Sequence, residues 1–323
     1  MSTIAVDAMG GDSAPEEVVK GAILAKKEGV DVILSGDENL IKSYLGNEKI
    51  PVINYPQVIS MDDDPAKAIR SNKDSSIIGA LNLVKEKKAD AVFSAGSTGA
   101  TLIGAISVLG KIKGVTRPTI ASVLPGKEKE VILVDSGANL EVKPKVLYQF
   151  AIMGSKLSEL LFDIENPRIG LINNGEESSK GRELEKATFK LLKSSQLNFI
   201  GNVEGKDFAN SKVDVFVTDG FTGNVVLKTL QGVAKLQQDL ISKSLKENLF
   251  KPLLIPVKNA ISPVKSMLNP NSTNGSYLLG VNGLVIIGHG SSNSDAIKNA
   301  LLFTSRAVEK RFINKFTEVS SEL

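Results

Sequence analysis

The sequence predicts an α/β fold in which a mainly parallel β-sheet is covered by helices on both faces. Short apolar runs rich in β-branched residues alternate with longer helical patterns, which is typical of parallel strands joined by helical crossovers. The chain has 323 residues, of which 42% are hydrophobic and 23% charged, so it can bury a sizeable core. We expect a single domain over residues 1–323, with a protruding apolar and basic segment at about residues 245–272.

The individual elements follow from the period and the composition of each run. Every predicted strand is short and mostly apolar, as expected of a strand that is buried on both faces. The predicted strands are Ile4–Val6, Val32–Leu34, Val52–Asn54, Ala91–Ser94, Thr119–Val123, Val131–Val134, Arg168–Ile172, Val213–Val217 and Leu284–Ile287. The predicted helices are Pro15–Glu28, Ser75–Lys87, Thr98–Leu109, Pro144–Leu161, Gly181–Lys193, Gly223–Leu245 and Ser294–Phe312.

The stretch from Leu249 to Pro270 differs from the rest of the chain. Apolar residues are frequent in it, Lys recurs every seven residues, and Pro252, Pro256 and Pro263 divide it into short pieces. Composition leaves two interpretations open, a lid or dimer-packing segment and a contact with a membrane interface.

Composition excludes several classes of site and partner. The chain has no Cys and a single His, His289, which excludes disulfides, zinc–thiolate sites and a Cys nucleophile. A net charge of +3 and an aromatic content of 5% argue against nucleic-acid binding. Met1–Asp7 resembles a first strand more than a signal peptide, and no run of about 18 apolar residues occurs. We therefore expect a cytoplasmic protein.

Cofactor motifs are also missing from the sequence. It contains no G-x-x-x-x-G-K-[ST] motif, and the nearest dinucleotide pattern, Gly288–Asn293, lacks its third glycine. Asp7, Asp12, Asp135 and Asp219 carry oxygen ligands of the kind that hard cations use, but no metal requirement is evident. We expect neither a cofactor nor a metal.

Six predicted strands end in small and polar residues that precede a helix. Glycine lets the backbone approach a ligand closely, and a helix N-terminus offers free N–H groups to an anion. Each motif by itself equally suits an ordinary turn or helix cap, but six at the carboxyl edge of one sheet would form a shared cleft. The six segments are Val6–Pro15, Phe93–Ala100, Val134–Asn139, Ile172–Gly181, Val217–Asn224 and Ile287–Asn293.

These residues suit a reaction in which inorganic phosphate is the nucleophile. Cys is absent and no Ser lies in a G-x-S-x-G motif, so no covalent nucleophile is evident. Phosphate attack on a thioester needs a bound phosphate, a carbonyl placed within roughly 3–3.5 Å and a stabilised oxyanion. Lys180, in a polar loop before a helix, is the candidate phosphate-binding cation; the alternative is a solvated loop lysine. His289 is a candidate base, and the alternative for it is a structural role.

Together the six motifs resemble one family nearly end to end, the bacterial phosphate acyltransferases of phospholipid synthesis, usually called PlsX. The matching segments are Asp7–Asp12, Ser94–Ala100, Asp135–Asn139, Asn174–Glu177 with Lys180–Gly181, Thr218–Val225 and His289–Ser292. The resemblance implies a Rossmann-like α/β/α sandwich related to phosphotransacetylases and isopropylmalate dehydrogenase-like folds. It also implies conversion of acyl-acyl carrier protein and inorganic phosphate to acyl-phosphate, which feeds a membrane-bound glycerol-3-phosphate acyltransferase.

The resemblance further implies a homodimer that contacts the membrane peripherally through an apolar helical tip near Leu249–Leu268. The expected membrane contacts are Leu253, Leu254, Ile255, Val257 and Ile261. The expected catalytic residues are Lys180, Asn224 and His289. The expected substrate- and phosphate-binding residues are Asp7, Gly10, Gly11, Asp12, Gly96, Ser97, Thr98, Gly99, Asp135, Gly137, Asn139, Asn174, Gly175, Glu176, Asp219, Thr222, Gly223, Ser291 and Ser292.

The chain departs from the family pattern at two places. Ser97 stands where the family usually has Asn, and Asn274–Gly280 stands where it usually has a Gly-Gly-Ala-Pro-like turn. Because a hydroxyl can replace an amide as a hydrogen-bond donor, we expect Ser97 to alter binding at the site only slightly and not to abolish it.

Two other functions remain open on the sequence. One is a phosphotransacetylase-type enzyme that uses acyl-CoA, and the other is a non-catalytic scaffold that recruits lipid-synthesis enzymes to the membrane. An acidic carrier protein docks on basic surface, which distinguishes the first alternative from the carrier-dependent enzyme. The candidate docking residues are Arg306, Lys310, Arg311, Lys315, Lys251, Lys258 and Lys265.

Overall fold

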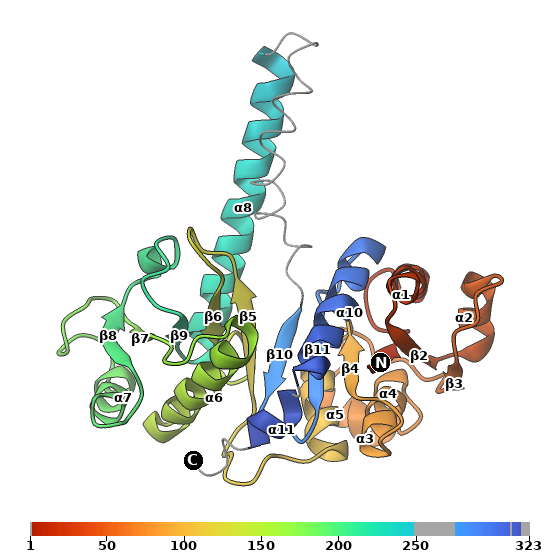
Figure 1. Ribbon diagram of the computed structural model, residues 1–323, viewed down its shortest axis with the longest axis horizontal. Helices are drawn as coiled ribbons and strands as arrows, with labels where there is room; N and C mark the ends of the chain where they lie inside the picture. Colours follow the sequence, from red (N-terminus) through yellow and green to blue (C-terminus); the bar gives the residue numbers. More distant parts are fainter. Residues whose placement is uncertain (1, 249–274, 311, 318–323) are drawn as a thin grey trace.

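The computed structural model describes residues 2–248, 275–310 and 312–317, and one 11-stranded sheet runs through them (Figure 1). The strand order is β3-β2-β1-β4-β11-β10-β5-β6-β9-β7-β8. The strands are β1 Thr3–Asp7, β2 Asp31–Gly36, β3 Val52–Asn54, β4 Ala91–Ser94, β5 Thr119–Leu124, β6 Val131–Val134, β7 Ile169–Ile172, β8 Phe199–Val203, β9 Val215–Val217, β10 Ser276–Leu279 and β11 Leu284–Ile287.

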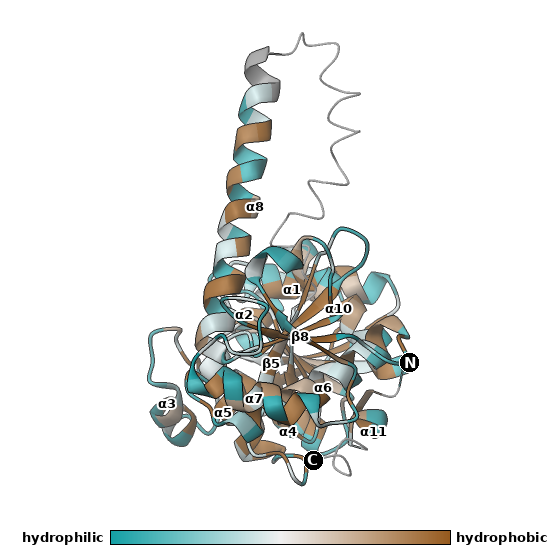
Figure 2. Cartoon of the chain, turned by 90° about the vertical axis from the view of Figure 1, so that its left-hand side faces the viewer, coloured by the Kyte–Doolittle hydropathy of each residue, from teal (hydrophilic) through white to brown (hydrophobic). Residues whose placement is uncertain are grey.

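Helices cover both faces of this sheet, because side chains along each strand alternate between the faces. In β1, Ile4 and Val6 join a core cluster with α1, α6, α10 and α11, whereas Ala5 joins a second cluster with α3, α4 and α5. The helices are α1 Glu16–Lys27, α2 Glu38–Leu45, α3 Pro65–Ser71, α4 Ser76–Lys85, α5 Thr98–Val108, α6 Pro144–Phe162, α7 Glu183–Lys193, α8 Gly220–Asn248, α10 Ser294–Glu309 and α11 Phe312–Thr317, with the 3-10 turn η1 Gly205–Phe208. Figure 2 shows the hydrophobic strands enclosed between these helical layers.

The sheet changes direction near its centre. Strand β11 pairs parallel with β4, but β10 is antiparallel to both β11 and β5, and β5 is antiparallel to β6. The group β6-β9-β7-β8 therefore runs opposite to the group β3-β2-β1-β4-β11. The expectation that six strand-end loops share one edge of the sheet is wrong, because the loops after β6, β7 and β9 leave from the edge opposite to those after β1, β4 and β11.

The predicted elements agree with the structure within three residues at their ends. Strands β8 and β10 and helices α2, α3 and α11 were not predicted, and the helix predicted for Ser294–Phe312 ends at Glu309. Strand β10 was not predicted because Ser276–Leu279 is short and lies within Asn274–Gly280, the segment compared above with a turn of the family. Its pairing with β5 on one side and β11 on the other makes it a strand.

Helix α8 extends away from the body of the molecule (Figures 1 and 2). Its outer part carries exposed apolar side chains, with Leu236 57% and Leu240 58% exposed. The protruding segment expected at about 245–272 begins in the last turn of this helix, and residues 249–274 lie outside the described part of the chain, together with the five expected membrane contacts. None of the described helices is both long and apolar enough to cross a membrane.

Candidate active site

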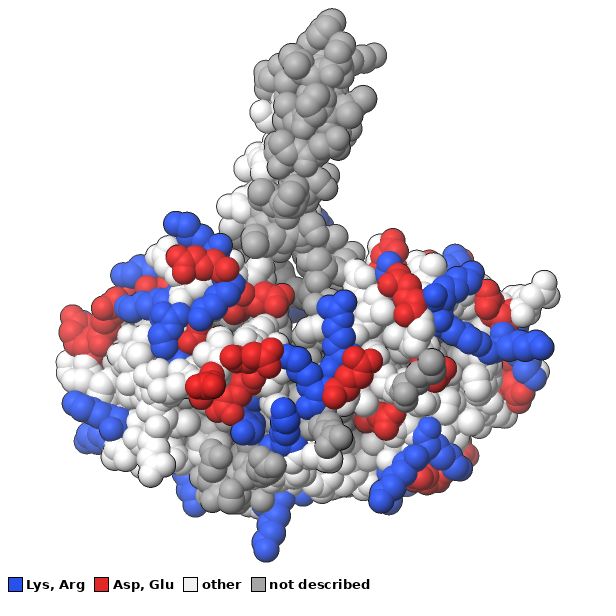
Figure 3. Space-filling view, viewed as in Figure 1, with Lys and Arg blue, Asp and Glu red and all other residues white. Residues whose placement is uncertain are grey.

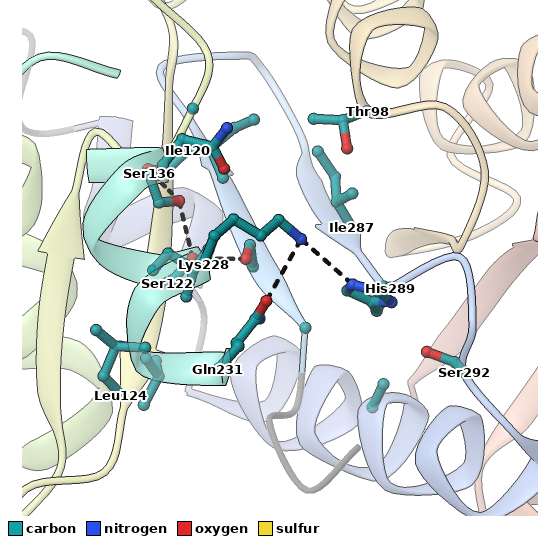
Figure 4. Close-up of a pocket in the computed structure, with 18 of the residues that line it drawn as sticks. Thr98, Ile120, Ser122, Leu124, Ser136, Lys228, Gln231, Ile287, His289 and Ser292 are labelled. Atoms are coloured by element: carbon teal, nitrogen blue, oxygen red, sulfur yellow. Dashed lines mark hydrogen bonds between the residues drawn. The ribbon is translucent and has the colours of Figure 1, made fainter. Parts of the chain in front are cut away.

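A cavity of about 250 Å³ lies where the two oppositely directed halves of the sheet meet. Its floor includes alternate residues of β5, Ile120, Ser122 and Leu124, which point to one face of the sheet. The N-terminal part of α8, the end of β11 and the start of α5 form its walls (Figure 4). The polar lining residues are Thr98, Ser122, Ser136, Asn224, Lys228, Gln231, Ser276, His289 and Ser292. No Asp or Glu lies among the residues described as lining it.

A row of three serines crosses the floor of the cavity. Strand register places Ser276 of β10 opposite Ser122 of β5, and their Oγ atoms are 2.8 Å apart. Ser122 donates to Ser136 Oγ at 2.8 Å, and Ser136 donates to the carbonyl of Ile120 at 3.2 Å. Because Ser122 uses its proton on Ser136, Ser276 is the donor in the remaining bond. Each hydroxyl in the row therefore donates in the same direction, and the last one donates to a backbone carbonyl.

Lys228 is the cation of the cavity. Its Nζ lies 3.4 Å from Gln231 Oε1 and 3.4 Å from His289 Nε2 (Figure 4). Asn224, Lys228 and Gln231 occupy positions i, i+4 and i+7 of α8 and so share one helix face. The side chain reaches the cavity because α8 starts directly beside the loop after β6, where Gly137 and Asn224 are in contact.

His289 faces this lysine as a neutral imidazole. Its Nδ1 lies 2.8 Å from Ser291 Oγ, and burial together with the charge of Lys228 lowers the pKa of the imidazole below its ordinary value. The N–H of Ser291 lies 3.3 Å from Nδ1 and favours a lone pair there, but the charged ammonium of Lys228 can only donate and is the stronger donor, so it favours the tautomer in which Nε2 carries the lone pair. The ring is thereby held with one acceptor nitrogen at the cavity.

The loops after β1, β4 and β11 pack against one another on the side of the cavity formed by His289. Asp12 N–H donates to the carbonyl of Gly290 at 2.8 Å, and a Cβ on Gly10 would lie 2.7 Å from the Gly96 nitrogen. Ser94 Oγ donates to the buried carboxyl of Asp7 at 2.6 Å. Burial raises the pKa of the Asp7 carboxyl, although the hydroxyl and N–H donors around it act in the opposite direction.

The carboxylates of the other half hold the backbone that places α8. Asp135 accepts from the N–H groups of Gly137, Ala138 and Asn139 at 2.8–3.0 Å. Burial raises the pKa of this carboxyl, against the effect of those donors. Asp219 accepts from Thr222 N–H at 2.7 Å at the start of α8 and pairs with Arg182. Both side chains are buried and engaged with the protein.

The structure thus separates the predicted site residues into three groups. Thr98, Gly137, Asn224 and His289, with Ser292, line the central cavity. Asp7, Gly10, Gly96 and Ser97 line a separate recess of about 10 Å³. The third group lies outside both spaces and includes Asn174, Gly175, Glu176 and Lys180 in the loop after β7, where Glu176 pairs with Lys212 at 2.9 Å. It also includes Asp135, Asn139, Asp219 and Thr222, whose contacts are described above.

Lys180 does not line the central cavity, and Lys228, which the sequence analysis missed, does. The available signal was the spacing of Lys228, one helical turn beyond Asn224 in the same predicted helix. Within the described ranges, no three acidic or His side chains gather as they would to hold a metal ion.

Comparison with solved structures gives the same architecture. The chain superposes on the EutD phosphotransacetylase from Staphylococcus aureus with a TM-score of 0.62 at 17% identity, covering 94% of this chain and 93% of that one. A branched-chain phosphotransacylase from Enterococcus faecalis gives a TM-score of 0.59 at 15% identity, covering 95% and 99%. These likenesses confirm the predicted Rossmann-like α/β/α fold.

Comparison with known sequences identifies the family to which the chain belongs. A model of the family described as fatty acid synthesis protein matches residues 2–315. The phosphate acyltransferase of Halothermothrix orenii is 43% identical over 320 residues, 96% of each chain, and that of Leptospira biflexa is 44% identical over 325 residues, 98% of this chain and 96% of the relative. With these relatives and with the fold described above, the chain belongs to the phosphate acyltransferase family and is an acyltransferase.

Proposed function

We propose that this protein transfers the acyl group of acyl-acyl carrier protein to inorganic phosphate, releasing acyl-phosphate and free carrier protein for phospholipid synthesis. The observation that carries the proposal is the lining of the central cavity. Lys228, the hydroxyls of Thr98 and Ser292 and the amides of Asn224 and Gln231 supply hydrogen-bond donors there, without a carboxylate among the described lining residues. Such a lining favours a phosphate dianion and a developing oxyanion.

The reaction then needs no protein nucleophile. A phosphate oxygen attacks the thioester carbonyl, a C–O bond forms, and the tetrahedral intermediate collapses with cleavage of the C–S bond. The proton of hydrogen phosphate ends on the departing thiolate, so that atoms and charge balance. Neutral His289 is suited to carry that proton because its Nε2 lone pair faces the cavity.

Lys228 takes the role of phosphate-binding cation in this mechanism. Lys180, the residue predicted for that role from the sequence, lies in the exposed loop after β7 and outside the cavity lining. A point charge stabilises the transition state only when it lies close to the charge that develops. Separate substitution of the two lysines tests this choice.

The quaternary structure, cytoplasmic location and membrane contact remain part of the proposal. A homodimer with peripheral membrane contact, supplying acyl-phosphate to a glycerol-3-phosphate acyltransferase, is supported by the exposed apolar side chains of α8. The membrane contacts proposed at Leu253–Ile255, Val257 and Ile261 lie outside the described residues.

A second candidate uses acyl-CoA as the donor. It is favoured by the fold, which the chain shares with a phosphotransacetylase and a phosphotransacylase. Both candidates share the attack on a thioester and differ only in the thiol carrier.

The test is acyl-phosphate formation by the purified protein. Palmitoyl-acyl carrier protein and palmitoyl-CoA are each supplied with and without inorganic phosphate, and the product is trapped as the hydroxamate. We expect phosphate-dependent product from the carrier-protein donor. Product from CoA alone would select the second candidate, and no product from either donor would reject both.

A further inference from the structure

An open groove of about 970 Å³ runs along the outer face of α7, away from the central cavity. Pro144, at the start of α6, and Ser178 and Ser179, in the loop after β7, form part of its wall. The remaining lining residues belong to α7 and its end: Glu183, Lys186, Ala187, Phe189, Lys190, Leu191, Lys193 and Ser194. The mechanism proposed above uses none of these residues.

Three lysines form a stripe along this groove. Lys186, Lys190 and Lys193 follow one another at intervals of four and three residues and therefore share one face of the helix. Lys186 Nζ lies 3.3 Å from a carboxylate oxygen of Glu183, whose side chain is 94% exposed. Lys190 and Lys193 form no ion pair with any residue that the structure describes. Figure 3 shows basic side chains at the lower left, where Figure 1 places α7.

Apolar surface lies beside this stripe. Leu191 is 39% exposed, and Ala187, one turn earlier, also lines the groove. Like charges on one helix face repel each other, and an exposed leucine gains by burial. A partner helix with carboxylates and apolar side chains on one face would neutralise the repulsion between the lysines and would bury the leucine. Amphipathic helices commonly bind grooves in this way.

We propose that the α7 groove is the docking surface for the acidic helical surface of the acyl carrier protein. The proposal rests on the proposed function, because that reaction requires a carrier protein to deliver each acyl group. Charge complementarity identifies the occupant, and the recessed shape fits a helix better than the plane of a membrane. Among the docking residues expected on the last helix, Lys310 already pairs with Asp163 at 2.9 Å.

Neighbouring residues and two side-chain contacts connect the groove with the elements of the central cavity. Ser178 and Ser179 line the groove, and Arg182, three residues further on, pairs with the buried carboxylate of Asp219. Asp219 caps the start of α8, and Lys228 lies nine residues later, about 13 Å along that helix. A carrier docked on α7 therefore lies beside the elements that build the cavity.

The experiment measures binding and turnover separately in the full-length chain. The test variant is Lys190→Glu/Lys193→Glu. The matched control is Lys67→Glu/Lys73→Glu, which makes the same change in net charge at exposed lysines of the other half of the sheet. Titration calorimetry with holo-acyl carrier protein gives Kd, and the hydroxamate assay gives KM and kcat for palmitoyl-carrier protein and for palmitoyl-CoA.

We expect Kd and the KM for the carrier-protein donor to rise at least tenfold in the test variant and to stay within twofold in the control. The kcat at saturating donor and any turnover of palmitoyl-CoA are expected to stay unchanged, because the cavity is untouched. The proposed docking site would be wrong if the test variant bound the carrier protein with wild-type affinity, or if the control variant lost as much affinity as the test variant. If carrier-protein binding depended on the groove lysines but no acyl-phosphate formed, the proposed reaction would be rejected and the docking surface would be supported.

Discussion

At the residue scale, the polar groups of this protein divide into those that hold the backbone and those that face the cavity. Asp135 and Asp219 have their carboxylates occupied by N–H groups or by Arg182. Lys228 and His289 instead point into an open space. The acidic residues of the strand-end motifs therefore build the loops, and the cationic and neutral donors are left for chemistry.

Replacement of Lys228 tests its role as the phosphate-binding cation. Lys228→Ala is expected to lower kcat/KM for phosphate about 100-fold, about 2.7 kcal/mol of transition-state stabilisation. Lys228→Arg keeps the charge and is expected to lose less. Steady-state kinetics with phosphate as the varied substrate measure the effect, and circular dichroism checks the fold. A larger loss in Lys180→Ala than in Lys228→Ala would return the role to Lys180.

The pH dependence of turnover tests the state of His289. The neutral imidazole is the proposed active form, and its pKa is lowered, first by burial and then by Lys228. Activity is therefore expected to fall only as pH drops below the ordinary pKa of about 6.5. Lys228→Met removes a neighbouring positive charge, so the acidic limb of kcat/KM is expected to move to higher pH. An unchanged limb in that variant, or the same limb in His289→Gln, would assign the titration to another group.

At the scale of single elements, the placement of α8 decides the site. Its first turn lies so close to the loop after β6 that a Cβ at Gly223 would be 1.8 Å from the carbonyl oxygen of Asp135. Gly137 in that loop has a positive φ of 147°, which is strained for other residues. The two glycines of the motifs thus bring Asn224 and Lys228 to the cavity by permitting close backbone approach.

Substitutions of two glycines in α8 distinguish the close packing of Gly223 against Asp135 from an effect on helix propensity. Gly223→Ala is expected to lower the Tm and to reduce activity at least tenfold, because the helix must move away from Asp135. Gly232→Ala is the control, since a Cβ there has no heavy atom within 4 Å. It is expected to leave activity intact and to stabilise the helix by about 1 kcal/mol. Equal effects of both changes in calorimetry and assay would contradict the packing argument.

At the scale of the whole molecule, the reversal in the sheet creates the cavity. Within the described residues, β10 and β5 stand between two groups of parallel strands that run in opposite directions. Loops of the two groups consequently leave from opposite edges. The cavity forms over the face of the short central strands, where Ser122 and Ser276 lie side by side.

Substitutions in the outer part of α8 test the proposed homodimer. Val233, Leu236 and Leu240 are 46–58% exposed in the single chain, and a partner that covers them gains the free energy of apolar burial. Leu236→Glu/Leu240→Glu is expected to shift the dimer toward monomer in light scattering. Gln237→Glu adds a charge at a neighbouring exposed polar position and is expected to leave the mass unchanged. A double variant that keeps the wild-type mass would remove α8 from the proposed interface.

The sequence by itself determined the class of fold, most of the elements and the family. Alternation of apolar runs and helical periods is a local property, and motifs such as Thr218–Val225 are read directly from neighbouring residues. Of the residues that were predicted for the site, Thr98, Asn224 and His289 line the cavity, whereas Gly223, predicted to bind substrate, lies against the backbone of Asp135.

Only the tertiary structure decided how these parts are combined. The direction of a strand relative to one far away in the sequence depends on long-range pairing, as between β10 and β5, and no local pattern encodes it. Lys228 resembles any lysine on an amphipathic helix until the packing of Gly223 against Asp135 aims that face at the cavity. Buried contacts between distant segments therefore fixed which polar side chains meet, because the free energy of burial depends on the whole packed sheet and not on neighbouring residues alone.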